Sequence, residues 1–165
     1  MAILTNQQLS KNLEISGIPC QPKEDCASIA LKVARKIHPQ IQEDEIAEAY
    51  RVGRQKDEQG KERLNRSILV KFRSLTTRDI IFKNKRVLTN VDTSNLGLSN
   101  LKKRIYVNEN LSYETRSLFR LANNLKKENN WKFIWTNSGT IYVKKDVNSK
   151  ILSISSIKDL DVMKA

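Results

Sequence analysis

The residues with the clearest chemical potential are cations, and they gather in the later part of the chain. Residues 1–60 carry 8 lysines and arginines against 9 acids, whereas residues 61–165 carry 22 against 9. The whole basic excess, a net charge of +12, therefore arises after residue 60. Clustered cations attract phosphate-bearing chains, so an excess this one-sided favours a polyanionic partner. We expect nucleic acid, with acidic membranes and acidic proteins as the other polyanions that fit.

Catalytic chemistry finds little support in the same sequence. The single histidine, His38, stands at a predicted helix end, and the acidic run 43–45 has no second acidic cluster at a useful spacing. Cys20 and Cys26 lack metal-ligand spacing, which favours two reduced thiols in an intracellular protein. The five glycines form no phosphate-binding loop. We therefore expect no enzyme, no metal and no cofactor.

The element around which the cations are organised is a strand predicted over residues 65–73. Its side chains alternate between an apolar face and a half-polar, basic face, which is the period of a strand with one buried side. The apolar face would hold Ile68, Val70 and Phe72, and the other face Ser67, Leu69, Lys71 and Arg73.

Strand and helix signals alternate around this strand. Further strands are predicted over residues 11–18, 45–52 and 105–107, and helices over 24–37 and from Thr76 or Thr77 to 86. In the first helix, Glu24 and Asp25 would occupy the first turn, where acids favour the helix dipole. The second helix would be capped by its threonine. The order strand, helix, strand, strand, helix, strand is ferredoxin-like, with an antiparallel sheet and helices on one face.

The remaining residues predict a small second lobe. Ser112 would cap a helix to about Asn129, followed by a hairpin that turns at 136–139, a strand over 151–154 and a short helix over 156–163. We thus predict an α+β protein with three parts. Residues 1–10 would be disordered or left from an expression vector, 11–110 an RNA-recognition-like βαββαβ lobe, and 111–165 a small α/β-hairpin lobe.

An aromatic stripe in the hairpin allows two interpretations. Trp131, Phe133 and Trp135 alternate, so they would share one side of the strand. They could stack nucleic-acid bases, or they could pack on the preceding helix as the core of the small lobe. We favour the core, because few other large apolar residues are available there.

Four segments in order carry a resemblance to known proteins. They read K-N-L-E-I-S-G-I-P, A-Y-R-V-G-R, R-S-I-L-V-K-F and R-I-Y-V-N-E-N-L-S, followed by an arginine-bearing helix and the Trp-rich hairpin. The chain resembles the C-terminal half of first open-reading-frame proteins of LINE-type retrotransposons. It is also similar to the C-terminal domain of the baculovirus few-polyhedra protein and its insect relatives. This resemblance implies single-stranded nucleic-acid binding in a cleft between two lobes.

The chain departs from that family in two ways. RNA-recognition modules stack bases on aromatic residues of their two central strands. The corresponding positions here read Glu14, Ser67 and Leu69, so no stacking platform is predicted on those strands. The family's N-terminal coiled coil is also missing, since no sustained heptad pattern occurs. Self-association would therefore need a region outside this chain.

The function predicted from the sequence is non-sequence-specific binding of single-stranded RNA or DNA, by a module of retroelement or viral type. The alternative is a protein–protein interaction module on an RNA-recognition-like scaffold. We expect no membrane partner and an intracellular location, in the nucleus or in a cytoplasmic ribonucleoprotein. The predicted phosphate-binding residues are Arg51, Arg54, Arg63, Arg66, Lys71, Arg73, Lys83, Lys85, Arg86, Lys103, Arg104, Arg116, Arg120 and Lys127. For Arg51, Arg66, Lys71, Lys83 or Lys85, and Arg116, the resemblance implies this role, because they match basic positions of the family's pattern.

Overall fold

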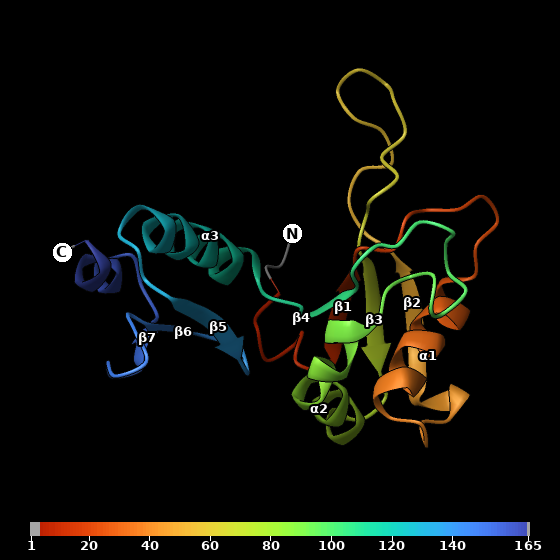
Figure 1. The fold of residues 1–165 in the computed structure, drawn as a ribbon, viewed down its shortest axis with the longest axis horizontal. Coiled ribbons are helices and arrows are strands. Elements are labelled where there is room, and N and C mark those ends of the chain that lie inside the picture. Colours follow the sequence, from red (N-terminus) through yellow and green to blue (C-terminus); the bar gives the residue numbers. More distant parts are fainter. Residues whose placement is uncertain (1–3, 165) are drawn as a thin grey trace. The chain divides into compact units, whose positions relative to one another are not determined.

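A computed structural model describes residues 4–164 and confirms the α+β class (Figure 1). The chain divides into two compact units. The central unit is Lys11–Asn110, and the terminal unit contains the described residues before and after it, 4–10 and 111–164. None of the helices formed by residues 4–164 combines the length and apolar character that a membrane crossing requires.

The central unit is built on one antiparallel sheet of four strands. Its strands are β1 (Asn12–Ser16), β2 (Ile46–Arg51), β3 (Ile68–Phe72) and β4 (Tyr106–Glu109). They lie in the order β2-β3-β1-β4, so β2 and β4 are the edges. Helix α1 (Cys26–Ile37) follows β1, and α2 (Leu75–Lys83) follows β3. Two short 3₁₀ helices, η1 (Glu43–Glu45) and η2 (Lys85–Asn90), complete the unit.

The two helices begin at residues that the sequence interpretation did not choose. Asp25 is the N-cap of α1 and accepts hydrogen bonds from the backbone N–H groups of Ala27 and Ser28. Glu24 therefore lies before the helix rather than in its first turn. Ser74, not a threonine, caps α2 by accepting from the Thr77 N–H. In both helices a short polar side chain satisfies N–H groups that have no partner within the helix.

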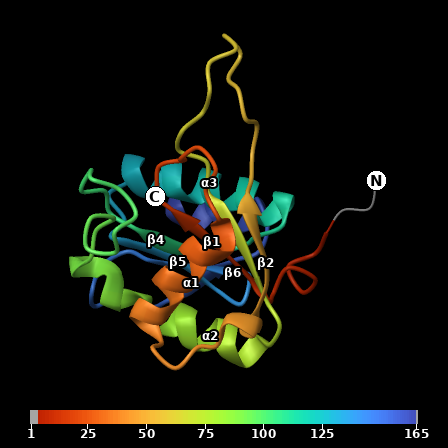
Figure 2. The same ribbon diagram turned by 90° about the vertical axis from the view of Figure 1, so that its right-hand side faces the viewer.

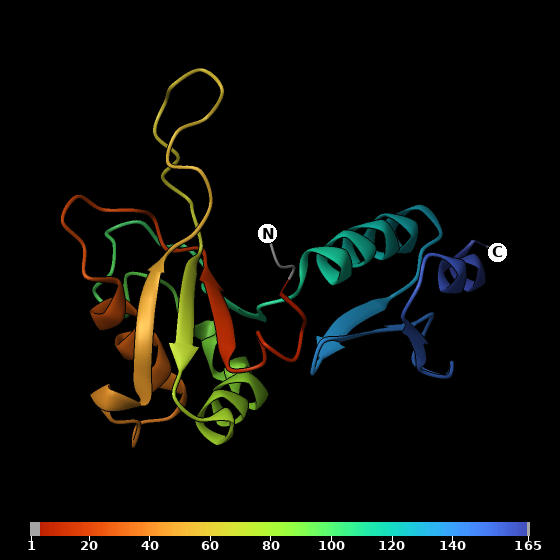
Figure 3. The same ribbon diagram turned by 180° about the vertical axis from the view of Figure 1, so that it is seen from behind.

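The apolar core lies between the sheet and these helices. Ile68, Val70 and Phe72 are buried, as the alternation predicted, and they cluster with Val33 of α1 and Ile81 of α2. The opposite face, called here the open face, carries no helix of this unit. In Figure 3 this face is turned to the viewer, with α1 and α2 behind the strands.

A long loop between β2 and β3 forms an arm, residues 52–67, that projects beyond the sheet (Figure 2). Its two sides are joined by a backbone bridge between Lys56 and Glu62 and by a hydrogen bond from the Arg63 N–H to the Gln55 carbonyl. At the base, the Cys20 N–H donates to the Leu64 carbonyl, which ties the arm to the segment after β1.

The terminal unit packs one helix on a second antiparallel sheet. Ser112 caps α3 (Tyr113–Glu128), as predicted. Strands β5 (Phe133–Asn137), β6 (Thr140–Lys144) and β7 (Leu152–Ile154) follow in that spatial order, and the 3₁₀ helix η3 (Lys158–Met163) closes the chain. The core gathers Ala122 of α3, Ile141 and Val143 of β6, and Leu160 and Met163 of η3.

Residues 4–10, for which the sequence predicted disorder or a vector remnant, form successive turns in the terminal unit. The side-chain amide of Asn6 makes three hydrogen bonds there. Its Oδ1 accepts from the Ser112 N–H at 2.7 Å, and its Nδ2 donates to Thr115 Oγ1 at 2.8 Å and to the Gly139 carbonyl at 3.3 Å. Residues 1–3 of the predicted segment lie outside the described residues.

Candidate nucleic-acid interface

A groove of about 350 Å³ on the central unit brings four of the predicted cations together. It lies between the end of α2, η2 and the edge strand β4, and it is called the β4 groove here. The cations are Lys83, Lys85, Arg86 and Arg104. Among the described residues that line it, none is acidic. The β4 groove therefore has the electrostatic character of an anion site.

The local fold explains why these cations converge. Helix α2 ends at Lys83, and the chain continues directly into η2, so Lys85 and Arg86 remain beside the carboxyl end of α2. Cations are favoured there because the last carbonyls of a helix carry partial negative charge. Arg104 reaches the same place from the other side, since it immediately precedes the buried Ile105, the last residue before β4.

Lys85 has a structural role within the groove. Its Nζ donates to the Val107 carbonyl of β4 at 3.1 Å and lies 4.4 Å from the centre of the Phe82 ring. Burial lowers the pKa of Lys85, and the nearby Arg78 cation lowers it further, while the Glu109 carboxylate opposes both. Lys85 thus covers part of the edge of β4, whereas Lys83, Arg86 and Arg104 are exposed.

A buried ion pair beneath the groove was not predicted. Arg78 of α2 donates from Nη2 to Glu109 Oε2 of β4 at 2.6 Å, and both side chains are at most 5% exposed. The sequence held one signal for this pair. Glu109 follows the inward-facing Val107 by two residues, so it points to the core, where a carboxylate needs a cation.

Two exposed tyrosines lie on the edge strands. Tyr106 of β4 is 47% exposed and Tyr50 of β2 is 42% exposed. A cation lies over each ring, with Arg104 Cζ at 5.0 Å from the Tyr106 centroid and Lys71 Nζ at 5.6 Å from that of Tyr50. The sequence alone leaves Tyr106 open between base stacking and core packing, and it stands between two apolar residues as an outward-facing residue of a strand does.

Arg51, by contrast, is committed within the fold. Its side chain is 5% exposed and forms a two-point ion pair with Glu24, from Nε to Oε1 at 2.7 Å and from Nη2 to Oε2 at 2.9 Å. The guanidinium also donates to the carbonyls of Ile18, Pro19 and Arg66. With these partners Arg51 stabilises the base of the arm and offers no donor to a phosphate, so we remove it from the candidate residues.

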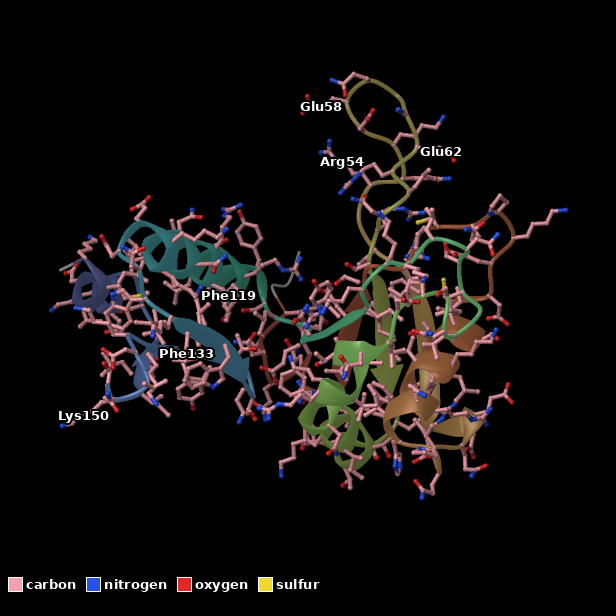
Figure 4. The ribbon with its side chains drawn as sticks, viewed as in Figure 1. Arg54, Glu58, Glu62, Phe119, Phe133 and Lys150 are labelled. Carbon is pink, nitrogen blue, oxygen red and sulfur yellow. The ribbon has the colours of Figure 1, made fainter. Side chains whose placement is uncertain are left out.

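The arm carries three further candidates. Arg54 and Arg63 are exposed, and Arg66 is half-buried at the base. Figure 4 shows Arg54 on the same projecting loop as Glu58 and Glu62. A second pocket of about 350 Å³ at the arm base is lined by Arg63 and Arg66 but also by two glutamates. The arm therefore carries charges of both signs, whereas the charged residues that line the β4 groove are all cations.

Three candidates of the central unit lie apart from the groove lining. Lys71 forms an exposed ion pair with Glu48 at 3.2 Å, and hydrogen bonding to that carboxylate raises the pKa of Lys71. Arg73 is exposed and donates from Nε to the Asp44 carbonyl at 2.6 Å. Lys103 is exposed and holds Thr93 through its backbone.

The remaining three candidates belong to the terminal unit. Arg116, Arg120 and Lys127 are exposed on α3. The inward side of the helix packs Leu118, Phe119 and Leu125 against the core, while Leu121 is 41% exposed.

The aromatic stripe divides between two environments. Trp131 is 6% exposed and belongs to the core, as predicted. Phe133 is 38% exposed. Trp135 stacks on its cross-strand neighbour Tyr142, with 5.8 Å between the ring centroids. The prediction that all three share one side is wrong, because Trp131 precedes β5 and the inward residue of that strand is Ile134.

Comparison with known families gives one match. A family model described as baculovirus FP protein domain 2 matches residues 112–164, from the cap of α3 to the end of η3. This supports the baculoviral part of the predicted resemblance over the terminal unit. The likeness to LINE-type retrotransposon proteins stays a prediction. No curated protein matches the chain.

Proposed function

We propose that this chain binds single-stranded nucleic acid through its backbone phosphates, with little sequence preference. The observation that carries the proposal is the β4 groove, where Lys83, Lys85, Arg86 and Arg104 converge without an acid in the lining. Phosphates are the commonest partners of such cations, and contacts to them carry no sequence information. The β4 groove would be the phosphate site of the central unit.

Several features of the chain fit this proposal. The net charge of +12 would draw a polyanion toward the protein. The exposed cations of α3 would add phosphate contacts from the terminal unit. The match to a baculovirus FP domain supports a module of viral type. We further propose that the chain acts in an intracellular ribonucleoprotein of the nucleus or cytoplasm, with a retroelement origin as the other possibility.

A protein–protein interaction module is the second candidate function. The observation in its favour is an apolar groove of about 360 Å³ on the terminal unit, lined by Leu118 and Leu121 of α3 together with the exposed Tyr113 and Ile157. The edge of β4 is less suited to a peptide strand. Lys85 of η2 already binds the Val107 carbonyl there, and an edge covered by a neighbouring element is less open to strand addition.

The experiment is a binding titration of single-stranded RNA over a series of salt concentrations. The logarithm of affinity should fall linearly with the logarithm of salt, with a slope of about −0.7 for each phosphate contacted. The variant Lys83→Glu/Arg86→Glu should bind more weakly and with a shallower slope. Both residues are exposed, so the fold should survive.

The matched control is Lys32→Glu/Lys36→Glu on α1. These lysines are exposed in the same unit and the change in net charge is identical, but they do not line the groove. An equal loss in both variants would mean that the overall field binds the strand and not the groove. An affinity independent of salt would reject phosphate binding and favour the protein partner.

A further inference from the structure

The β4 groove contains one exposed aromatic ring beside its cations. Tyr106 lies between Ile105 and Val107, which are 2% and 4% exposed, so its side chain projects from the face of β4 opposite the core. Nearly half of its surface meets solvent, although a large ring is usually buried in a folded domain. An exposed ring that lines a basic groove is the combination that single-strand binding proteins use for bases.

From this geometry we propose that the β4 groove is a nucleotide subsite, in which an unpaired base stacks on Tyr106 while neighbouring phosphates contact Lys83 and Arg86. The inference rests on the proposed function and adds to it the recognition of a base. The ligand class is an unstacked nucleotide of a single strand, since a base inside a duplex keeps both faces against its neighbours.

Arg104 contacts the Tyr106 ring and restrains its position. Its guanidinium carbon lies 5.0 Å from the centre of the Tyr106 ring, which is cation–π distance. The contact restrains both side chains before any ligand binds. A planar guanidinium can itself stack on a base, so Arg104 and Tyr106 together could contact the base and an adjoining phosphate.

The other aromatic residue of the groove, Phe82, is less exposed than Tyr106. Phe82 is half-buried, with Lys85 Nζ at 4.4 Å and Arg78 Cζ at 5.0 Å from its centroid. Those cations are held in turn by the Val107 carbonyl and by Glu109. Phe82 therefore supports the floor of the groove, and Tyr106 is the ring of the lining that a base can reach.

The proposed subsite does not use the central strands of the sheet. On β1 and β3 the corresponding positions are Glu14 and Leu69, which pair with each other across the strands. Leu69 is only 8% exposed, and neither side chain offers a ring for stacking. Stacking at the edge of β4 thus takes a different place from the one at which RNA-recognition modules usually hold bases.

The experiment compares an oligothymidylate with an abasic strand of the same length and phosphate count. The wild-type protein should bind the base-bearing strand more tightly, by about 5- to 150-fold for one stacked base. Tyr106→Leu should bring the two affinities close together, because the ring on which the base stacks is removed. Tyr106→Phe should restore the difference, because it retains the ring.

The matched control is Tyr50→Leu. Tyr50 has similar exposure, also lies beneath a cation, and stands on the opposite edge strand, outside the groove. Its replacement should leave the preference for bases intact. Equal wild-type affinity for both strands, or an equal loss from Tyr50→Leu and Tyr106→Leu, would overturn the subsite while phosphate binding stood. Failure to bind either strand would overturn both proposals.

Discussion

Glu24 and Arg51 form a buried two-point ion pair that joins the segment before α1 to the end of β2. The side chains are 13% and 5% exposed, and the same guanidinium holds three backbone carbonyls around the base of the arm. A cation with this many partners fixes the geometry of the surrounding loops. Its removal would leave a largely buried carboxylate and several carbonyls without their donor.

We expect Arg51→Met to lower the free energy of unfolding by about 3–5 kcal/mol, because breaking one side of a buried pair strands the other charge. Urea unfolding measures this. Lys71→Met is the control, since the Lys71–Glu48 pair is exposed and should contribute less than about 1 kcal/mol. Similar small losses in both variants would show that the Arg51 pair is not a structural anchor.

The same pair should make stability depend on acid pH. Hydrogen bonding to Arg51 lowers the pKa of Glu24, with burial opposing it. A lowered pKa in the folded state contributes stability above the ordinary glutamate pKa of about 4.3, and that stability is lost as pH falls through the folded value. Free energies of unfolding measured between neutral pH and pH 3 should fall more steeply for the wild type than for Glu24→Gln. Parallel curves would contradict this assignment.

Trp131 and Trp135 should respond differently to truncation. Trp131→Ala removes a core side chain and should cost about 3–5 kcal/mol, with a clear fall in melting temperature. Trp135→Ala removes a half-buried ring and its stacking on Tyr142, so its cost should be smaller. Trp131→Phe should be milder than Trp131→Ala, because Phe keeps an aromatic ring in the core. The Nε1 that Phe lacks has no hydrogen-bond partner among the described residues, so its loss should cost little. Equal melting temperatures for Trp131→Ala and wild type would reject the core assignment.

Charge reversal on α3 tests whether the terminal unit contributes to nucleic-acid binding. Arg116→Glu/Arg120→Glu should weaken binding of a long single strand and leave the melting temperature nearly unchanged, since both side chains are exposed. Lys150→Glu/Lys158→Glu makes the same change in charge elsewhere in that unit. If the α3 variant bound as tightly as this control, phosphate contact would be confined to the central unit.

The features that depend on residues close together in the sequence could be predicted from local patterns. The alternation of Ile68, Val70 and Phe72 identified a strand and its buried face, because strand period and burial are read within a few residues. The cations at 83, 85 and 86 lie close together for a similar local reason, since they surround one helix end.

Pairings over long separations could not be read in this way. The partner of Arg51 lies 27 residues away, so no local pattern distinguishes a structural arginine from a phosphate-binding one. Arg78 and Glu109 are 31 residues apart and meet only when α2 packs beneath β4. The prediction for the aromatic stripe was wrong for a different reason. The alternating pattern begins two residues before β5, so it assigned Trp131 to a strand that starts only at Phe133.

The hydrogen bonds of Asn6 have a consequence for the order in which the chain folds during synthesis. The Ser112 N–H that Asn6 binds lies 106 residues later, whereas the whole central unit, Lys11–Asn110, is made in between. A ribosome adding about 5–20 residues per second needs roughly 5–20 seconds to cover that interval. The central unit is one continuous stretch of chain and can therefore fold first. Residues 4–10 can pack only after Ser112 and the rest of the terminal unit have been synthesised. The terminal unit, divided between the two ends of the described chain, must form last and after translation of α3.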